Sequence, residues 1–249
     1  MPGVDRYTAM MLHCNGTNGS SVFTDSSTNV LTFTTSGTAT ITTSNFKFAT
    51  GSGMFDGASN TSTPDSAVLT LGSNDFTIDW QMLTSGSSAG AARFPWGQGN
   101  TTATAGFTVF SRQNTSDNTI TFFVSSDGIT LSTLVSTIAI STSAFTHCAF
   151  VRSGSTMMAF IGGVQTGGTL TYTGAVNDSS NIFALGALGE VVSSANRYIG
   201  LLDEFRYTVG VARWTADFTP SGVQYDEWMT EYGIGNISGK LVKVNVIGY

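Results

Sequence analysis

Residues 76–82 read Phe-Thr-Ile-Asp-Trp-Gln-Met, an alternation of apolar and polar side chains. Because successive side chains of a strand point to opposite faces, this period of two predicts a half-buried strand with Phe76, Ile78 and Trp80 on the core face. Turn-forming residues separate it from similar runs at 106–111, 119–124, 145–152, 156–161, 181–185, 198–208 and 241–247. Many short strands with turn signals between them predict an all-β protein of two packed sheets.

The composition favours strands over helices. Charged residues make up 10% of the 249 residues, against roughly 25% in ordinary soluble domains. The 29 Gly suit turns, and the 17 Phe and 41% hydrophobic content suit a packed core rather than a disordered chain. Cys14 and Cys148 are too few for a disulfide framework, so we expect two buried free thiols.

Charge and hydropathy argue against two classes of partner. The net charge is −6 and the 10 Lys and Arg residues are scattered, so no basic patch is present to neutralise nucleic-acid phosphates. No apolar run has the length of a signal-peptide core or of a membrane span. We therefore expect a protein made in the cytoplasm that binds neither nucleic acid nor a membrane.

Several segments resemble, in order, one family of β-sandwiches. Residues 74–80 are similar to the "D-F-T-I-E-F-W" strand of laminin-G-like, concanavalin A-like jelly rolls, and residues 145–154 to their "W-H-H-V-A-V-T-R-S-G" strand. Residues 202–207 are similar to their "I-D-E-V-R-I" strand. Residues 209–220 resemble "K-G-V-A-R-Y-T-x-N-F-T-P", a motif of tailed-bacteriophage virion proteins with this fold. The resemblance spans residues 7 to 220 and includes an opening "L-H-x-D-G-T-D-G-S"-like run near residue 12.

The resemblance implies a two-sheet antiparallel jelly roll over residues 1–220 and a C-terminal extension over residues 221–249. It implies a bacteriophage virion structural protein, as a capsid decoration or head or tail accessory, which contacts other virion proteins and forms homo-oligomers in the assembled particle. The covering segment near residues 210–220 is expected to be anchored by Trp214 and Phe218. The alternative left open is a carbohydrate-binding module that recognises host surface glycans.

A Gly- and aromatic-bearing run at residues 92–99 supplies the candidate glycan contacts, Trp96 and Arg93. An exposed indole stacks well on a sugar ring. Trp96 is equally suited to anchor its loop on the edge of the sandwich, because large aromatic side chains commonly serve as such anchors.

Jelly rolls of this family often hold calcium, and the resemblance places the matching carboxylates at Asp25 and Asp203. Calcium takes about six to eight oxygen ligands, which hydroxyl- and amide-rich loops supply. No EF-hand spacing is present, and Asp is also a common turn residue. Strand alternation predicts Asp203 on the core face beside Phe205, with Glu204 and Arg206 as a weak ion pair on the outer face.

Catalysis is not expected. Glucanases of the related sandwich carry their acid and nucleophile in an "E-x-D-x-x-E" pattern on one strand, which this sequence lacks. Asp203 and Glu204 are adjacent, so on a regular strand they point to opposite faces. The sequence also contains no G-x-S-x-G motif and no phosphate-binding glycine loop.

The run 241–247 predicts a terminal strand after a Gly-bearing hinge at residues 232–236. One face carries Val242, Val244 and Val246, and the other begins with Leu241 and ends with Ile247. An unpaired apolar edge is an aggregation hazard, so the strand is expected to pair, either with its own sandwich or by addition to a neighbouring subunit's sheet. We favour the second, an assembly arm, because a hinge and a terminal position suit it.

Overall fold

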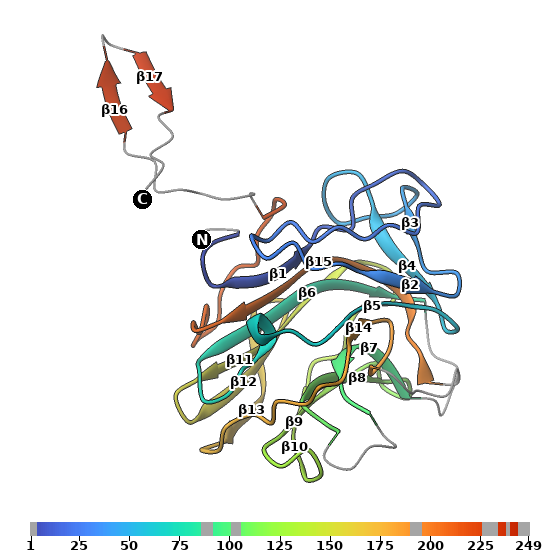
Figure 1. Ribbon diagram of the computed structural model, residues 1–249, viewed down its shortest axis with the longest axis vertical. Coiled ribbons are helices and arrows are strands. Elements are labelled where there is room, and N and C mark those ends of the chain that lie inside the picture. The colour runs from blue at the N-terminus through green and yellow to red at the C-terminus, as the bar shows by residue number, and fades with distance from the viewer. Residues whose placement is uncertain are drawn as a thin grey trace.

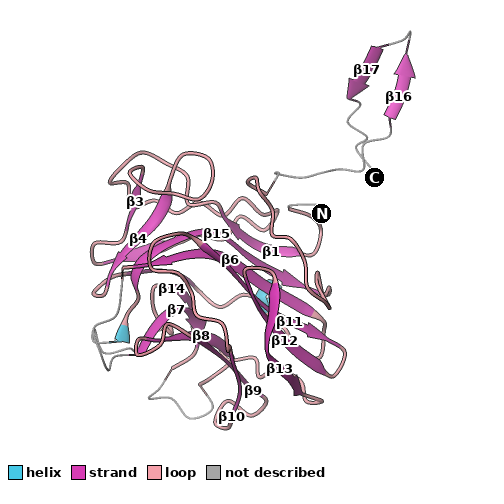
Figure 2. Cartoon of the chain, turned by 180° about the vertical axis from the view of Figure 1, so that it is seen from behind, coloured by secondary structure: helices cyan, strands magenta, loops and turns pink. Residues whose placement is uncertain are grey.

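The computed structural model describes residues 4–85, 92–100, 106–189, 196–225, 234–237 and 240–243. Two antiparallel sheets face each other as the layers of a sandwich, and a two-stranded sheet stands apart from them in strand pairing (Figures 1 and 2). No helix in this part of the chain is long and apolar enough to span a membrane. The all-β, two-sheet architecture expected from the sequence is confirmed.

The larger sheet has eight strands. Their order is β13 (Val164–Thr171), β12 (Thr156–Ile161), β11 (Thr146–Ser153), β6 (Phe76–Thr84), β15 (Ile199–Val209), β4 (Ser52–Asp56) and β3 (Thr40–Thr42), with β1 (Thr8–Leu12) also paired to β15. Strands β11 and β12 form the predicted hairpin, in which Ser153 lies opposite Thr156.

The smaller sheet has seven strands. Their order is β10 (Leu131–Val135), β9 (Ile120–Ser125), β8 (Val109–Asn114), β7 (Ala92–Gln98), β14 (Phe183–Leu185), β5 (Asn60–Thr63) and β2 (Thr34–Ser36). A short 3-10 helix, η1 (Ala67–Leu69), follows β5 and precedes β6, on the path from the smaller sheet to the larger one.

The core lies between the two sheets. Phe76, Ile78 and Trp80 are fully buried there, as the alternation of β6 predicts. The Trp80 ring meets Trp96 of the opposite sheet edge-on at 5.3 Å between centroids, and Phe205 at 6.2 Å. Such aromatic pairs add to the stabilisation that burial of their apolar area provides. Both cysteines are free and buried, as expected.

A β-bulge in β15 changes which side chains share a face. Glu204 and Phe205 together lie opposite a single residue of β6, and Glu204 has a left-handed φ of 49°. The alternation reverses there, so Asp203 and Arg206 lie on the outer face of the larger sheet while Phe205 enters the core. The prediction that Asp203 shares the core face with Phe205 is wrong, because simple alternation does not anticipate an inserted residue.

Residues 210–225 form a covering segment over the outer face of the larger sheet. Trp214 packs on a second apolar cluster on that face, made by Ala149, Val151, Met158 and Phe160. Phe218 stacks on Trp214 at 4.0 Å between centroids, and the Phe218 N–H donates to the Gly163 carbonyl. The predicted anchoring by these two aromatic residues is confirmed.

The C-terminal strands β16 (Ile234–Ile237) and β17 (Lys240–Lys243) pair with each other, with Asn236 opposite Leu241. The predicted strand at 241–247 is thus present as far as Lys243, with its partner in the same chain. The remaining candidate assembly residues, Val244, Val246 and Ile247, lie outside the described residues.

Candidate functional site

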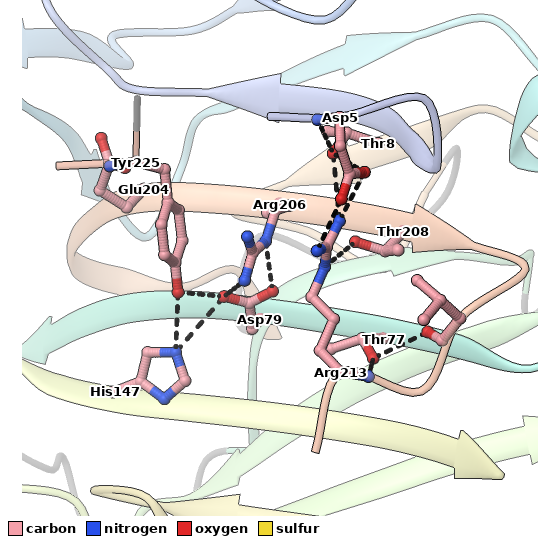
Figure 3. A network of polar contacts seen from close by, with 11 residues as sticks. Asp5, Thr8, Thr77, Asp79, His147, Glu204, Arg206, Thr208, Arg213 and Tyr225 are labelled. Carbon is pink, nitrogen blue, oxygen red and sulfur yellow. Dashed lines mark hydrogen bonds and ion pairs between the residues drawn. The ribbon is translucent and has the colours of Figure 1, made fainter. Parts of the chain in front are cut away.

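Asp79 is the centre of a buried polar network beneath the covering segment (Figure 3). Arg206 donates to both of its oxygens, from Nε at 2.9 Å and from Nη2 at 3.2 Å. The Tyr225 hydroxyl donates to Oδ2 at 2.8 Å, and His147 Nε2 lies 3.3 Å from the same atom. Strands β6, β15 and β11 and the covering segment therefore meet at one carboxylate.

The electrostatics of this network keep it ionised. Burial opposes the charge of Asp79, but Arg206 and then His147 hold the pKa of the carboxyl down to about 2. Burial likewise opposes the charge of Arg206, whose pKa nevertheless rises because Asp79 lies against it. The guanidinium also lies 3.8 Å from the centroid of the Tyr225 ring. The buried Asp79–Arg206 ion pair therefore holds the covering segment in place through its contacts with Tyr225.

Glu204 is held by a second set of partners. Its Oε1 lies 2.6 Å from His13 Nδ1, and its Oε2 accepts the Tyr225 N–H at 2.9 Å. The predicted surface pair of Glu204 with Arg206 is therefore wrong: Arg206 binds Asp79, and both residues are buried. The bulge is the physical reason, because it directs the Glu204 carboxylate toward β1 and the covering segment.

Arg213 ties the covering segment to the N-terminal residues. Its guanidinium donates to both oxygens of Asp5, at 2.9 and 3.0 Å, and to the Thr208 hydroxyl at 3.0 Å. Val4 and Tyr225 lie in one small apolar cluster. The beginning and the end of the described sandwich thus lie side by side at one end of the larger sheet.

Asp25, one candidate calcium ligand, is occupied by protein donors. It accepts the N–H groups of Met11, Ser27 and Leu31 and the Ser27 hydroxyl, at 2.8 to 2.9 Å. The bond from Met11 occupies a backbone N–H of β1 on the side away from β15, and the other bonds hold the loop that contains Asp25. In the described part of the chain, no three His, Cys, Asp or Glu side chains form a group suited to a metal. A calcium ion at Asp25 would have to displace these donors, and calcium binding stays a prediction.

Asp203, the other candidate ligand, is fully buried on the outer face of β15. Its Oδ2 accepts the N–H groups of Lys47 and Phe48 at 2.8 and 3.1 Å, whereas its Oδ1 has no hydrogen-bond partner among the described residues. Burial raises the pKa of Asp203, and although the two N–H groups oppose this, the pKa is about 7. Asp203 thus fixes the loop before β4 at an electrostatic cost.

This cost predicts a pH-dependent stability. The unfolded carboxyl has a pKa near 3.8 and the folded one about 7, so the folded state binds the proton more tightly. The contribution of Asp203 to the unfolding free energy is therefore favourable below pH 4 and is lost as the pH rises to about 7. Urea denaturation measures the unfolding free energy of the wild type and of Asp203→Asn. As the pH rises from 4 to 7, the wild type should lose stability relative to the variant. A difference between the two that does not change with pH would contradict the assignment.

The two candidate glycan contacts, Trp96 and Arg93, both make contacts within the protein. Trp96 lies on β7 and is 0% exposed, with its ring among Trp80, Phe183 and Phe205. Of the two roles considered for Trp96, stacking on a sugar is ruled out by this burial, because the indole has no free face. Arg93 is half-buried, and its Nη1 donates to the Arg197 carbonyl at 3.2 Å.

A pocket of about 410 Å³ opens on the outer face of the larger sheet, at the end of β15 that pairs with β4 rather than β1. Its floor contains Met54 of β4, Leu201 of β15 and Leu83 of β6. Phe55 and Gly200 also line it, together with five polar residues: Asn45, Asp56, Thr84, Ser85 and Thr142. Its size falls in the range of about 300–1,000 Å³ that is typical of small-ligand sites.

Local structure explains why this pocket is open. Gly200 of β15 has a φ of 149°, and a Cβ there would lie 2.4 Å from the Leu83 carbonyl oxygen, so only glycine fits. Asp203 holds the backbone of Lys47 and Phe48, and this fixes the loop that carries Asn45 to the pocket. Buried Asp203 therefore helps to position Asn45 in the pocket lining.

Sequence reasoning did not find this pocket, because its lining comes from five separate segments without a motif. One signal was present. On the face of β6 that carries Thr77, Asp79 and Gln81, the next residue is the apolar Leu83. Leu201 lies directly opposite both Leu83 and Met54 on the neighbouring strands. Strand pairing is needed to recognise that the three are neighbours.

A family model, Laminin_G_3, described as the concanavalin A-like lectin/glucanases superfamily, matches residues 55–208. No curated protein matches the chain. Among solved structures, the binding domain of Paraclostridial mosquitocidal protein 1 superposes with a TM-score of 0.62 at 13% identity, covering 83% of this chain and 49% of that chain.

Two further similar structures are complexes with a ligand. Domain 4 of AbnA, an extracellular arabinanase from Geobacillus stearothermophilus solved with arabinotriose, has a TM-score of 0.59 at 17% identity, covering 85% of this chain and 95% of that chain. The binding domain of botulinum neurotoxin DC with SialylT has a TM-score of 0.61 at 10% identity, covering 82% and 48%. The chain spans about half the length of the two toxin chains. At these low identities, the superpositions show a shared fold only.

Proposed function

Because the chain belongs to the concanavalin A-like lectin/glucanases superfamily, we propose that it is a lectin-like binding domain that holds a saccharide in the outer-face pocket. The observation that carries this proposal is the lining of the pocket, which combines an aliphatic floor with hydroxyl, amide and carboxylate groups. Sugars need this combination, since a pyranose has apolar C–H groups as well as hydroxyls. The arabinanase domain solved with arabinotriose and the toxin domain with SialylT have the same fold.

The position of the pocket supports a binding role. Strand β4 pairs with residues 199–202 of β15, whereas β1 pairs with residues 205–208 and lies beside the N-terminus. Figure 1 shows β1 and β4 toward opposite sides of the sandwich. A ligand in the pocket would thus approach from the side away from residues 4–8 and Tyr225.

We infer that binding is not followed by catalysis. Asp56 is the carboxylate among the described lining residues. Hydrogen bonds from the Thr38 hydroxyl, the Ser59 hydroxyl and the Ala58 N–H hold the pKa of Asp56 down to about 2. A group with that pKa accepts hydrogen bonds from sugar hydroxyls at neutral pH, but it has no proton to donate to a leaving group.

A glycan array tests this function. The wild-type chain should bind a subset of saccharides, and Ser85→Trp, which places an indole in the pocket, should weaken binding at least tenfold. Val164→Trp is the matched control, because Val164 is exposed on the far edge strand β13. Binding to no saccharide, or binding that Ser85→Trp leaves unchanged while both variants stay folded, would contradict the proposal.

A second candidate function is that of a bacteriophage virion structural protein, located in the particle and bound to other virion proteins. It is supported by the virion-type motif at residues 209–220 and by the β16–β17 sheet, whose strands pair with neither sheet of the sandwich among the described residues. A chain ending after Tyr225 keeps the Asp79 network. It should fold and bind saccharide yet fail to assemble into homo-oligomers or particles, and unchanged assembly would reject the arm.

A further inference from the structure

The floor of the pocket is a continuous aliphatic row. Leu201 lies directly opposite Met54 on one side and directly opposite Leu83 on the other, so the three side chains cross three neighbouring strands on one face. Directly opposed side chains in a sheet have Cβ atoms about 4.5–5.5 Å apart, close enough to form one surface. Met54 is 42% exposed, whereas the same sheet face further along is covered by residues 210–225. The row is therefore an apolar surface open to a ligand.

The charge of the pocket restricts that ligand. Asp56 is ionised at neutral pH, and none of the described lining residues is Lys or Arg. A ligand carboxylate would meet a like charge without a compensating cation. A sugar hydroxyl, by contrast, donates to the Asp56 carboxylate and gains a charge-assisted hydrogen bond.

The row also discriminates among neutral sugars. A hydroxyl or hydroxymethyl group placed on Met54, Leu201 and Leu83 would give up its hydrogen bonds to water without a new partner, which is costly. A methyl group in the same place loses nothing and is removed from water. The aliphatic floor thus favours a sugar that has a methyl group at the position where most hexoses have a hydroxyl.

We propose that the pocket selects a neutral pyranose bearing a methyl group, which lies on the Met54–Leu201–Leu83 row while a ring hydroxyl donates to Asp56. The inference rests on the proposed saccharide-binding function and specifies its substrate class. The methyl has two chemical sources: C6 of a 6-deoxyhexose or the acetyl group of an N-acetylhexosamine. The same apolar contact serves both.

Titration calorimetry with matched sugars tests the selection. Methyl α-L-fucoside differs from methyl α-L-galactoside only by lacking the 6-hydroxyl, and N-acetylglucosamine differs from glucose by the acetamido group. The methyl-bearing member of at least one pair should bind about tenfold or more tightly than its counterpart, the usual range for one such group in an apolar pocket. The pair that shows the preference identifies the source of the methyl.

Variants tie the preference to the row. Leu201→Thr should remove most of it, and Val164→Thr on β13 should leave it unchanged. If Leu201→Thr does not fold, Met54→Thr replaces it, because Met54 is 42% exposed and tolerates the change more readily. N-acetylneuraminic acid, which carries both an acetyl methyl and a carboxylate, should bind more weakly than N-acetylglucosamine, and Asp56→Asn should narrow that difference.

The results distinguish failure of the methyl selection from failure of the proposed saccharide binding. Saccharide binding without a methyl preference, or a preference that survives both row variants, overturns the inference and leaves the lectin-like function standing. Binding of no saccharide on the array overturns both. Loss of the preference in a folded row variant, with the β13 control unchanged, supports both.

Discussion

Replacing Asp79 with alanine should lower the free energy of unfolding by about 3–5 kcal/mol. The substitution leaves Arg206, which is 0% exposed, as a buried cation without its carboxylate. It also removes the acceptor of the Tyr225 hydroxyl. Most of the loss is the cost of a buried guanidinium that has lost its carboxylate, because an intact buried pair by itself contributes little net stability.

Equilibrium denaturation in guanidinium chloride measures this loss, and Asp5→Ala is the matched control. Asp5 also forms a carboxylate–arginine pair, with Arg213, but its side chain is 20% exposed. The space that Asp5→Ala leaves is open to water, and Arg213 keeps its bond to the Thr208 hydroxyl, so the control should cost less. An Asp79→Ala variant no less stable than Asp5→Ala would show that the Asp79 carboxylate is not what stabilises the buried Arg206.

The pH dependence of the same network has a defined sign. Asp79 has a folded pKa of about 2, below its value in the unfolded chain, so its contribution to stability is present above pH 4. That contribution is lost as the pH falls from about 4 to about 2. The pH dependence of Asp203 has the opposite sign, since its folded pKa is raised to about 7.

Alternation identified the strands because burial on one face is a local property. The strand expected at residues 76–82 is β6, and the hairpin expected at 145–152 and 156–161 is β11 and β12. The strand and turn pattern predicted two packed sheets, and the family resemblance added their jelly-roll arrangement. Neither anticipated the bulge at Glu204, because its cause is the pairing of β15 with β6 rather than the sequence around it.

The site was less accessible from the sequence than the fold. Its floor is defined by register across β4, β15 and β6, in which residues 54, 83 and 201 become neighbours. Its polar groups are Ser, Thr and Asn, which this chain carries almost everywhere. Long-range pairing, rather than a motif, makes them a site. The sequence therefore offered a glycan-binding alternative but placed its contacts at Trp96 and Arg93, which do not line this pocket.

Trp96 shows the same limit in one residue. The surrounding Gly and aromatic residues suggested a loop, yet residues 92–98 form strand β7, with a bulge between Arg93 and Trp96. The bulge directs the indole inward, where it meets Trp80 edge-on and stacks with Phe183 at 6.2 Å between centroids. The residues around Trp96 in the sequence therefore do not distinguish an exposed indole from a buried one.

Trp96→Ala should therefore destabilise the protein by about 3–5 kcal/mol, as a large cavity would open between the two sheets. Trp96→Phe should cost less, because the buried indole N–H has no hydrogen-bond partner among the described residues and only volume is lost. Thermal or chemical denaturation measures both. Under conditions where each variant is still folded, both should bind saccharide like the wild type, since Trp96 does not line the pocket. A stable Trp96→Ala that has lost saccharide binding would instead make this indole a ligand contact, and it would move the binding site from the outer face of the larger sheet to β7.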